Sequence, residues 1–581
     1  MNAQSLLIVS MPWARADAPS LQLGILKAHL LSAGVKVKTL HAAPRLAKLL
    51  GKQQYWQVAN NIHPLLSEAC FASVQDPDFP HAEFIKRMMD TQEFSQQQIE
   101  RLLNLVEFFC EELAAEKPWE SYDIVGFSCT FNQLQASLWA AGEAKKYGCR
   151  TVFGGFLLQG DMGKKLLKYV SVDAVIDGPG ELGLPEWMRQ GCPSGYYSVS
   201  SGLPVPRIPE YDDYFADMPE KEQEEKTLLL ETSRGCEHGA CAFCTQNARL
   251  GRHIYPASYL DECLKNFMQQ YSCRALEFAD TSFPVQVAEN IPKNSSGKKH
   301  LERYHVFAES RAINSSEMRI FSQAGFSQLQ IGIESLHSAV LDKIQKGSSL
   351  LENVCCLRES WNHKIHIMYN IILDMPGMTE TEVREMISML PLLYHLPPPS
   401  ALVSFQLQLN SAVFRHPEKY GITKISPHAH HALFGPEYPS FYFSFSQTSS
   451  LSSTLLEEAH EAFSRWEHTF TCQQPLAVVR FWDEYVEVYD ARFCEGSKKY
   501  RLGKDAARLL RMCRNPQPDF LLRKRIGVSF PAVLEDLLEC GLLLEENGRY
   551  LTLPVMVWKN KDIFPQAERE PMDSYFTPPV L

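Results

Sequence analysis

The sequence predicts an α/β protein built from three parts. Two long stretches, residues 1–202 and 227–440, each alternate strand-like apolar runs with helix-like runs, a pattern typical of parallel sheets covered by helices. The tail, residues 441–581, instead shows helices followed by a short hairpin. A chain of 581 residues is too long for one hydrophobic core. We therefore expect a doubly wound Rossmann-like domain, a partial βα barrel of the TIM type, and a small α+β winged-helix-like domain.

Short apolar runs in the first part predict the strands of a doubly wound sheet. Helical spacing over residues 21–31 and 134–147 separates these runs. Residues 41–120 break the alternation with helix-compatible sequence, so we expect an inserted helical segment there. The predicted strands cover residues 6–9, 35–37, 123–127, 151–153 and 173–176.

Small and polar residues follow the later strands of this first sheet. Sheets of this kind bind ligands outside the carboxyl ends of their strands. Glycines there let the backbone approach a bulky ligand, and hydroxyl groups offer it hydrogen bonds. Each cluster, taken alone, could equally be a tight turn or a helix cap. The candidate binding residues are Ser128, Thr130, Gly154, Gly155, Gly178, Gly180 and Glu181.

A segment rich in proline and acidic residues, 203–226, predicts an extended linker to the second part. Chemistry in a βα barrel sits at the carboxyl ends of the strands. An acid after one strand could also be a plain surface residue, and an arginine could form a structural salt bridge. The predicted strands cover residues 275–278, 304–308, 328–335, 365–373 and 402–409, and the candidate site residues at their ends are Asp280, Glu309, Ser310, Arg311, Gly332 and Glu334.

Three cysteines, Cys236, Cys241 and Cys244, lie in one loop directly after the apolar run 228–230. Close thiolates bind soft metals or an iron–sulfur cluster. Three of them would leave one iron of a 4Fe–4S cubane open to a small molecule. Structural zinc stays an alternative, and it would need a fourth ligand, for which His238 and His253 are the candidates.

The sequence around this loop resembles the cluster loop of the radical SAM superfamily. Ser233-Arg-Gly-Cys236 precedes the loop, and Phe243 stands directly before the last cysteine. The family usually has three residues between its first two cysteines, whereas this chain has four. With the strings SMPWARADAPSLQLGILKAHL, GFSCTFNQ, PEYDDYF and QIGIES, residues 5–440 resemble the cobalamin-dependent radical SAM enzymes that mature ribosomally synthesised peptides, mostly C-methyltransferases.

The resemblance implies cofactors and their binding residues. The three cysteines would hold a 4Fe–4S cluster, and residues 1–202 would bind cobalamin, as methylcobalamin, through the strand-end residues above. No Asp-x-His-x-x-Gly string occurs, so we expect no protein histidine below the cobalt. S-adenosylmethionine would meet Phe243, Asp280, Glu309, Ser310, Arg311, Gly332 and Glu334.

The resemblance also implies a reaction and its partners. A 5′-deoxyadenosyl radical would take hydrogen from an unactivated carbon of a precursor peptide, which would then receive a methyl group. An electron donor such as flavodoxin or ferredoxin would reduce the cluster. A rearrangement or cyclisation without methylation stays open, as does a non-catalytic cobalamin- or peptide-binding regulator. The tail, with its Asn547-Gly548 turn, resembles peptide-recognition modules, although a plain packing domain is an equal alternative.

Composition sets further limits on the partners and the location. The net charge of −11 argues against a nucleic acid partner. No apolar run reaches the roughly 20 residues of a membrane helix, and the N-terminus does not resemble a secretion signal. The 16 scattered cysteines suit a reducing, cytoplasmic location. We expect His428, His430 and His431 to lie in a solvated loop and not to bind metal.

Overall fold

The structure is a computed structural model, and its described residues form two compact units. The first unit comprises Met1–Leu230, Tyr255–Glu277 and Ser426–Ser446, and the second comprises Glu231–Ile254, Phe278–Ile425 and Gln447–Leu581. The described residues are 5–60, 65–90, 94–130, 132–199, 202, 204–216, 218–245, 252–291, 305–427, 444–447, 451–473, 477–492 and 496–556. The predicted histidine loop at 428–431 lies outside them.

The first unit contains the predicted doubly wound sheet, which is parallel throughout and has the strand order β2-β1-β3-β4-β5-β6. The chain runs outward from β1 to β2 and then reverses to β3, so the topological switch point lies between β1 and β3. The sequence analysis missed the short edge strand β6. The strands are β1 (Ser5–Ser10), β2 (Lys36–His41), β3 (Ile124–Ser128), β4 (Arg150–Gly154), β5 (Ala174–Asp177) and β6 (Gly195–Ser198).

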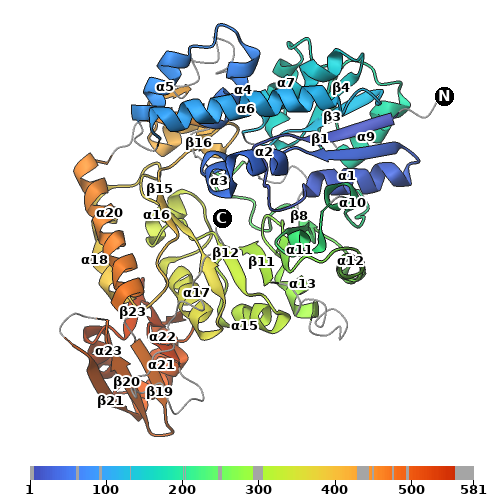
Figure 1. Cartoon of the computed structure of the whole chain (residues 1–581). Coiled ribbons are helices and arrows are strands. Elements are labelled where there is room, and N and C mark those ends of the chain that lie inside the picture. The colour runs from blue at the N-terminus through green and yellow to red at the C-terminus, as the bar shows by residue number, and fades with distance from the viewer. Residues whose placement is uncertain are drawn as a thin grey trace. The chain divides into compact units, whose positions relative to one another are not determined.

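Helices cover this sheet and bury its apolar side chains. The core includes Leu6, Ile8, Ile124 and Val152 from the strands, packed with Leu23 from α1. The covering helices are α1 (Leu21–Ser32), α7 (Leu134–Lys145), α8 (Asp161–Leu166) and α9 (Gly180–Arg189). The stretch predicted as a helical insertion forms five helices between β2 and β3, and the long α6 lies beside α4 and α5 in Figure 1. They are α2 (Ala43–Leu50), α3 (Lys52–Ala59), α4 (Leu65–Gln75), α5 (His81–Asp90) and α6 (Gln96–Glu116).

The segment predicted as an extended linker packs onto the first unit. It forms the short helices α10 (Asp212–Phe215) and α11 (Glu220–Gln223), followed later by α12 (Ala257–Gln270). Tyr211 is fully buried, and its hydroxyl donates to the carbonyl of Leu229 at 2.6 Å. A Cβ at Gly24 would come within 2.4 Å of the Tyr211 ring. The aromatic residues of this acidic stretch therefore override its linker-like composition.

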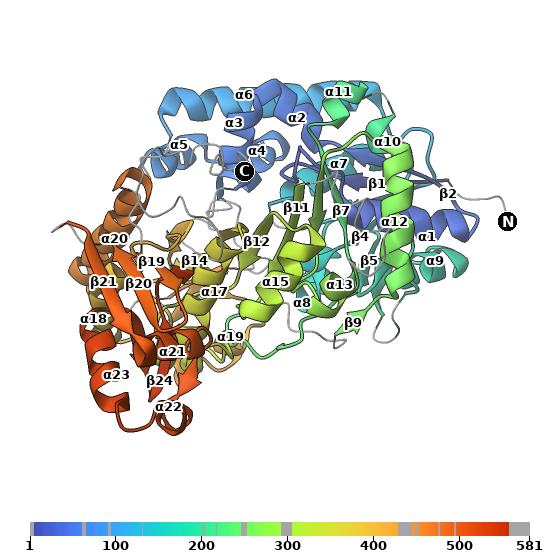
Figure 2. The ribbon, with the colours of Figure 1, turned by 90° about the horizontal axis from the view of Figure 1, so that it is seen from below.

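The second unit holds most of the predicted barrel strands. Strands β11 (His305–Ser310), β12 (Gln328–Ile331) and β13 (His366–Met368) pair in parallel. Strand β7 (Thr227–Leu230) belongs to the first unit, as do the first three residues of β10 (Ala275–Phe278). Helices α15 (Ser315–Ala324) and α17 (Leu350–Asn362) lie side by side in Figures 1 and 2. Parallel strands with covering helices confirm the α/β class predicted for this region.

One strand predicted over residues 365–373 is in fact two strands in two sheets. After β13 the chain enters β14 (Asn370–Ile372), which pairs with β15 (Ala401–Val403). Between them the fully buried Tyr369 donates its hydroxyl to the carbonyl of Pro397 at 2.8 Å. The strand predicted over 402–409 likewise divides into β15 and β16 (Leu407–Gln408).

The C-terminal part of the second unit has the predicted α+β composition. Strands β19 (Ala477–Phe481), β20 (Tyr485–Asp490) and β21 (Lys498–Gly503) are antiparallel. Helices α21 (Lys504–Met512), α22 (Asp519–Ile526) and α23 (Phe530–Glu539) follow, and then a hairpin of β23 (Leu543–Glu546) and β24 (Arg549–Thr552). Its turn residues Asn547 and Gly548 have φ of 51° and 69°, as a two-residue hairpin turn of this kind requires.

The remaining elements are mostly short, except for the 16-residue α20, and none of the described helices is long and apolar enough to cross a membrane. They are β8 (Ser233–Arg234), β9 (His253–Ile254), α13 (Val285–Asn290), α16 (Ser338–Lys343), α18 (Glu380–Met389), α19 (Ala412–Arg415), β17 (Ile425–Pro427), β18 (Ser444–Gln447), α20 (Ser453–His468), β22 (Gln517–Pro518) and β25 (Val555–Met556).

Candidate functional site

The three cysteines of the second unit lie in a loop whose two ends are joined by an antiparallel pair. Strand β8 before the loop pairs with β9 after it. Cys236, Cys241 and Cys244 are each partly exposed, whereas Ala242 between them is fully buried. The loop is therefore anchored by its alanine and presents its thiols at the surface of the unit.

Asp280 holds the root of this loop. Its carboxylate accepts hydrogen bonds from the amide and hydroxyl of Thr232, at 3.0 and 2.9 Å, and from the Ser233 hydroxyl at 2.6 Å. The side chain is almost completely buried, and because burial outweighs these hydrogen bonds, its pKa is raised to about 7. The resemblance assigned Asp280 to S-adenosylmethionine, whereas the structure places its carboxylate on the cysteine loop.

A second support comes from the turn at residues 344–347, which the sequence analysis missed. The Ala242 amide donates to the carbonyl of Ile344 at 2.8 Å, and Nε2 of His238 lies 2.6 Å from the carbonyl oxygen of Gln345. Gly347 has a φ of 76°, and a Cβ there would come within 2.5 Å of the His238 ring. No local pattern reveals this turn, because its contacts join residues about a hundred positions apart.

Gly332 and Glu334 lie beside the same turn. Glu334 is a non-glycine residue with a φ of 61°, a conformation that costs free energy and persists only where the surroundings impose it. The buried Asn353 braces it by donating Nδ2 to the carbonyls of Ile333 and Ser335, at 3.2 and 3.0 Å. The Glu334 carboxylate receives Nζ of Lys346 at 2.9 Å.

Of the three residues predicted at the end of β11, only Arg311 has a described side chain. Glu309 and Ser310 are the last two residues of the strand, in register with Gln330 and Ile331 of β12, and their side chains lie outside the described part. Arg311 is half-exposed and forms an ion pair with Glu317 at 2.6 Å. Its guanidinium therefore makes the structural salt bridge considered as its alternative role.

The donor set of the cysteine loop fits an iron–sulfur cluster. In the described part of the chain, no three His, Cys, Asp or Glu side chains converge as one metal ion would require. Thiolates that bind different irons of a cubane need not converge on one point. Burial raises the pKa of Cys241, while the nearby Lys346 cation works in the opposite direction. A cation beside the thiols suits an anionic cluster.

The strand-end residues of the first unit gather on the neighbouring strands β3, β4 and β5. Ser128 at the end of β3 is in register with Gly154 at the end of β4. The amide and hydroxyl of Thr130 both donate to Oε1 of Gln133, at 3.0 and 2.6 Å. Gly180 begins α9, with Glu181 buried in its first turn. The prediction that these residues share one edge is therefore consistent with the sheet.

Two of the predicted glycines are explained by packing within the protein. Gly155 has a φ of 112°, and a Cβ there would lie 2.3 Å from the carbonyl oxygen of Cys129. Gly178 also has a φ of 112°, with the carbonyl oxygen of Val199 only 2.5 Å from such a Cβ. Both glycines are required by the turns themselves, so neither is independent support for a ligand.

One buried acid near this edge, Glu68, was missed in the sequence. Glu68 in α4 accepts the amides of Leu134 and Gln135 at the start of α7, at 3.1 and 2.7 Å. Burial raises its pKa to about 7. Asp177 at the end of β5 accepts the Gly160 amide at 3.0 Å and the Tyr196 hydroxyl. An acid inside the apolar run of α4 was the one available signal.

Comparisons with known proteins match this chain in fold. Its match to OxsB, a cobalamin-dependent S-adenosylmethionine radical enzyme solved with aqua-cobalamin and S-adenosylmethionine, has a TM-score of 0.52 and 14% identity over 81% of this chain and 67% of that one. Its match to TsrM, a radical S-adenosylmethionine methyltransferase from Kitasatospora setae solved with cobalamin and a 4Fe–4S cluster, has a TM-score of 0.53 and 13% identity over 80% and 91% of the two chains.

A relative by sequence is an uncharacterised methyltransferase from Pyrococcus horikoshii, 23% identical over 159 residues. The match covers 27% of this chain and about a third, 34%, of that protein. No protein-family model matches the chain. At these identities the likeness concerns architecture, and the α/β fold predicted from the sequence is the fold of cobalamin-dependent radical SAM enzymes.

Proposed function

We propose that this chain is a cobalamin-dependent radical SAM enzyme that methylates an unactivated carbon of a ribosomally synthesised peptide. The observation that carries the proposal is the cysteine loop. It is braced by Asp280 on one side and by the 344–347 turn on the other, and it leaves three thiols partly exposed. A fold shared with OxsB and TsrM supports the same conclusion.

The residues divide the proposed task between the two units. Cys236, Cys241 and Cys244 would hold a 4Fe–4S cluster, and the predicted strand ends of the first unit would bind cobalamin. When bound, the cluster, S-adenosylmethionine and methylcobalamin supply radical and methyl-transfer chemistry that side chains cannot. The protein's share is to hold the loop rigid, through the buried Asp280 and Asn353, and to fix where the cofactors bind. A flavodoxin or ferredoxin would donate the electron.

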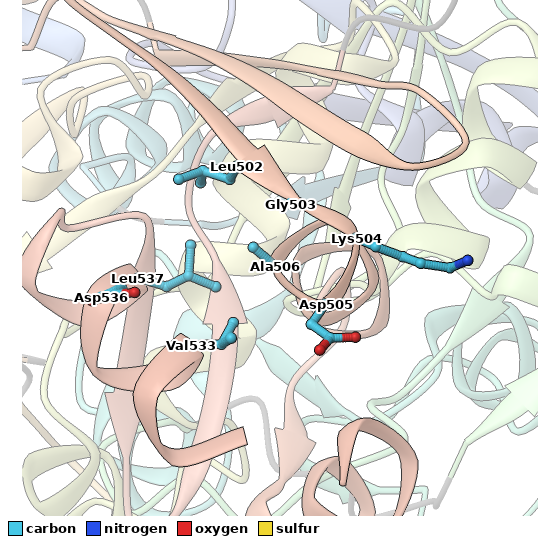
Figure 3. A pocket seen from close by; sticks show the side chains of 8 residues that line it. All are labelled: Leu502, Gly503, Lys504, Asp505, Ala506, Val533, Asp536 and Leu537. Carbon is cyan, nitrogen blue, oxygen red and sulfur yellow. The ribbon is translucent and has the colours of Figure 1, made fainter. Parts of the chain in front are cut away.

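The C-terminal part of the second unit offers a surface for the peptide. Among the described strands, β21 has a partner on one side only, so its other edge can take an added peptide strand. At its end lies a cavity of about 430 Å³ between β21, α21 and α23 (Figure 3). The cavity is lined by Leu502, Gly503, Lys504, Asp505, Ala506, Val533, Asp536 and Leu537.

The cavity and the strand edge together define the occupant. Leu502, Val533 and Leu537 point toward the same space in Figure 3, so an apolar side chain fits between them. Lys498, Lys499 and Arg501 of β21 have exposed side chains. Their positive charges favour acidic residues in a peptide bound beside the strand. We therefore assign to this edge an extended, acidic segment of the precursor peptide with one apolar anchor.

Anaerobic reconstitution tests the cluster loop. The wild type should bind iron and sulfide and should form 5′-deoxyadenosine from S-adenosylmethionine and dithionite. The triple variant C236A/C241A/C244A should lose both properties, whereas Cys472→Ala, at an exposed thiol elsewhere in the unit, should keep both. Cleavage by the triple variant, or zinc in the wild type, would show that the assignment is wrong.

Co-expression with a peptide encoded next to this chain tests the reaction. Mass spectrometry should show added methyl groups, and a loss of hydrogen without them would indicate cyclisation. Val533→Glu, which puts a charge into the cavity, should abolish modification but leave formation of 5′-deoxyadenosine intact. Val528→Glu is the matched control, because Val528 is fully exposed and lies outside the cavity. Equal modification by both variants would exclude this cavity from peptide binding.

A further inference from the structure

The turn at residues 344–347 brings a cation to the cysteine loop. Ile344 and Gln345 contact the loop through their carbonyls, and Gly347 packs on His238. Between them Lys346 extends its side chain so that Nζ lies 5.7 Å from the centre of the Phe243 ring. Because Phe243 stands between Cys241 and Cys244 in sequence, the ammonium lies near the part of the loop that carries these two cysteines.

Other residues of the unit make room for this ammonium and orient it. A Cβ on Gly332 would lie 2.6 Å from Nζ of Lys346, so any other residue there would displace the lysine. The Glu334 carboxylate accepts from Nζ of Lys346 at 2.9 Å. The Lys346 side chain is only 14% exposed, so water screens its charge little.

The protonated state of Lys346 follows from the same neighbours. Its Nζ lies 2.9 Å from the Glu334 carboxylate, and an ammonium paired with a carboxylate is favoured in its charged form. The lysine therefore stays cationic at neutral pH.

We propose that Lys346 sets the charge environment of the iron–sulfur cluster and so makes its one-electron reduction easier. The inference rests on the proposed function, since it needs a cluster on the three cysteines. A cubane held by three thiolates is anionic, and it gains one more negative charge when an external one-electron donor reduces it. The donor is oxidised, no proton moves, and the fixed ammonium stabilises the reduced form more than the oxidised form.

Glu334 has the opposite effect in this arrangement. Its carboxylate offsets part of the lysine charge, so the pair defines two variants with opposite expected signs. Lys346→Met should lower the midpoint potential of the cluster, whereas Glu334→Gln should raise it. A tenfold change in the equilibrium constant for reduction, which is 59 mV for one electron, is the size expected for Lys346→Met.

The experiment is a potentiometric titration of the reconstituted protein, followed by electron paramagnetic resonance, without S-adenosylmethionine. Lys346→Arg keeps the charge and should keep the wild-type potential. Lys343→Met is the matched control, because Lys343 pairs with Glu382 at 2.6 Å and not with the loop. If Lys346→Met fails to load a cluster, the sign of the Glu334→Gln shift still decides the question.

Two results would overturn the inference while leaving the proposed function standing. One is a loaded cluster whose potential is the same in the wild type, Lys346→Met and Glu334→Gln. The other is an unchanged potential with a weaker Kd for S-adenosylmethionine in Lys346→Met, which would make the lysine a ligand of the methionine carboxylate. If the wild type loads no cluster at all, the proposed function fails first.

Discussion

Two buried carboxylates of the second unit, Asp280 and Glu359, have different neighbours and opposite responses to pH. Among the described residues, Asp280 accepts hydrogen bonds from two hydroxyls and an amide, and burial raises its pKa to about 7. Glu359 is fully buried against Arg358 and Arg514, and these cations outweigh burial and lower its pKa to about 2. The two side chains act in different regions of the unit. Asp280 supports the segment before the cysteine loop, whereas Glu359 supports the packing of the C-terminal elements.

Buried charges fix the C-terminal elements within the second unit. The Arg358 guanidinium donates to the carbonyls of Thr552 and Arg514. Arg492, paired with Asp490 at 2.6 Å, donates to the carbonyl of Leu392 at 2.9 Å. A peptide strand added to β21 would therefore be held on a rigid support and not on a loosely tethered module.

The largest expected effect comes from removing the charge of Glu359. Glu359→Gln leaves Arg358 buried without a charge partner, and breaking a buried pair in this way costs about 3–5 kcal/mol. The loss of unfolding free energy should appear as a lower urea midpoint for the second unit. Because the stabilising charge is lost only as pH falls toward 2, the deficit should be the same at pH 5 and pH 8.

An exposed ion pair provides the control for this variant. Glu458 pairs with Arg384 at 2.9 Å, and both side chains are about half exposed. Exposed pairs contribute about 0–1 kcal/mol, so Glu458→Gln should shift the midpoint little. Equal shifts in the two variants would mean that burial does not make the Glu359 ion pair more important for stability than the exposed pair.

The sequence predicted the parts of the fold whose signals are local. Apolar runs located most of the strands in both units, and Asn547-Gly548 located the hairpin turn, because each signal is complete within a few residues. It could not locate the break at Tyr369, since an unbroken apolar run does not show that a strand changes sheets. It also mistook the segment around Tyr211 for a linker, because the partner surface on α1 lies far away in sequence.

The residues of the candidate site were likewise predictable only where their signal is local. The cysteines are recognisable from their spacing, but the turn that carries Lys346 meets them only through the fold. Asp280 was predicted to contact S-adenosylmethionine, and that role stays a prediction; its carboxylate faces Thr232 and Ser233, which no strand-end pattern specifies. Glu309 and Ser310 stay predictions for S-adenosylmethionine, as do the first unit's strand ends for cobalamin.

The second prediction concerns the pH response at the root of the cysteine loop. The folded state keeps a proton on Asp280 up to about pH 7, whereas an unfolded aspartate releases it near pH 4. The unfolding free energy therefore falls as pH rises between these values. Asp280→Asn should cost about 1–3 kcal/mol at pH 5, because an amide nitrogen in place of Oδ2 cannot accept from the Thr232 amide that lies 3.0 Å from it.

The deficit of Asp280→Asn should shrink toward pH 8, since asparagine does not ionise. Urea unfolding of both proteins at pH 5 and pH 8 checks the sign. A deficit that is the same at pH 5 and pH 8 would show that the carboxylate is ionised throughout this range, and the contrast with Glu359 would then disappear.

The smallest expected effect lies in the first unit, at Glu68, and it extends the comparison beyond the cysteine loop. Burial raises the pKa of Glu68 and outweighs the hydrogen bonds that its carboxylate accepts from two amides of α7, so Glu68 should behave like Asp280. Glu68→Gln keeps one acceptor oxygen and should cost about 1 kcal/mol, again less at pH 8 than at pH 5. Hydrogen exchange at Leu134 and Gln135 should accelerate, while Glu83→Gln, at an exposed pair on α5, should leave it unchanged. Unaltered exchange at both amides would mean that Glu68 does not stabilise the start of α7. The likeness between Glu68 and Asp280 would then be wrong.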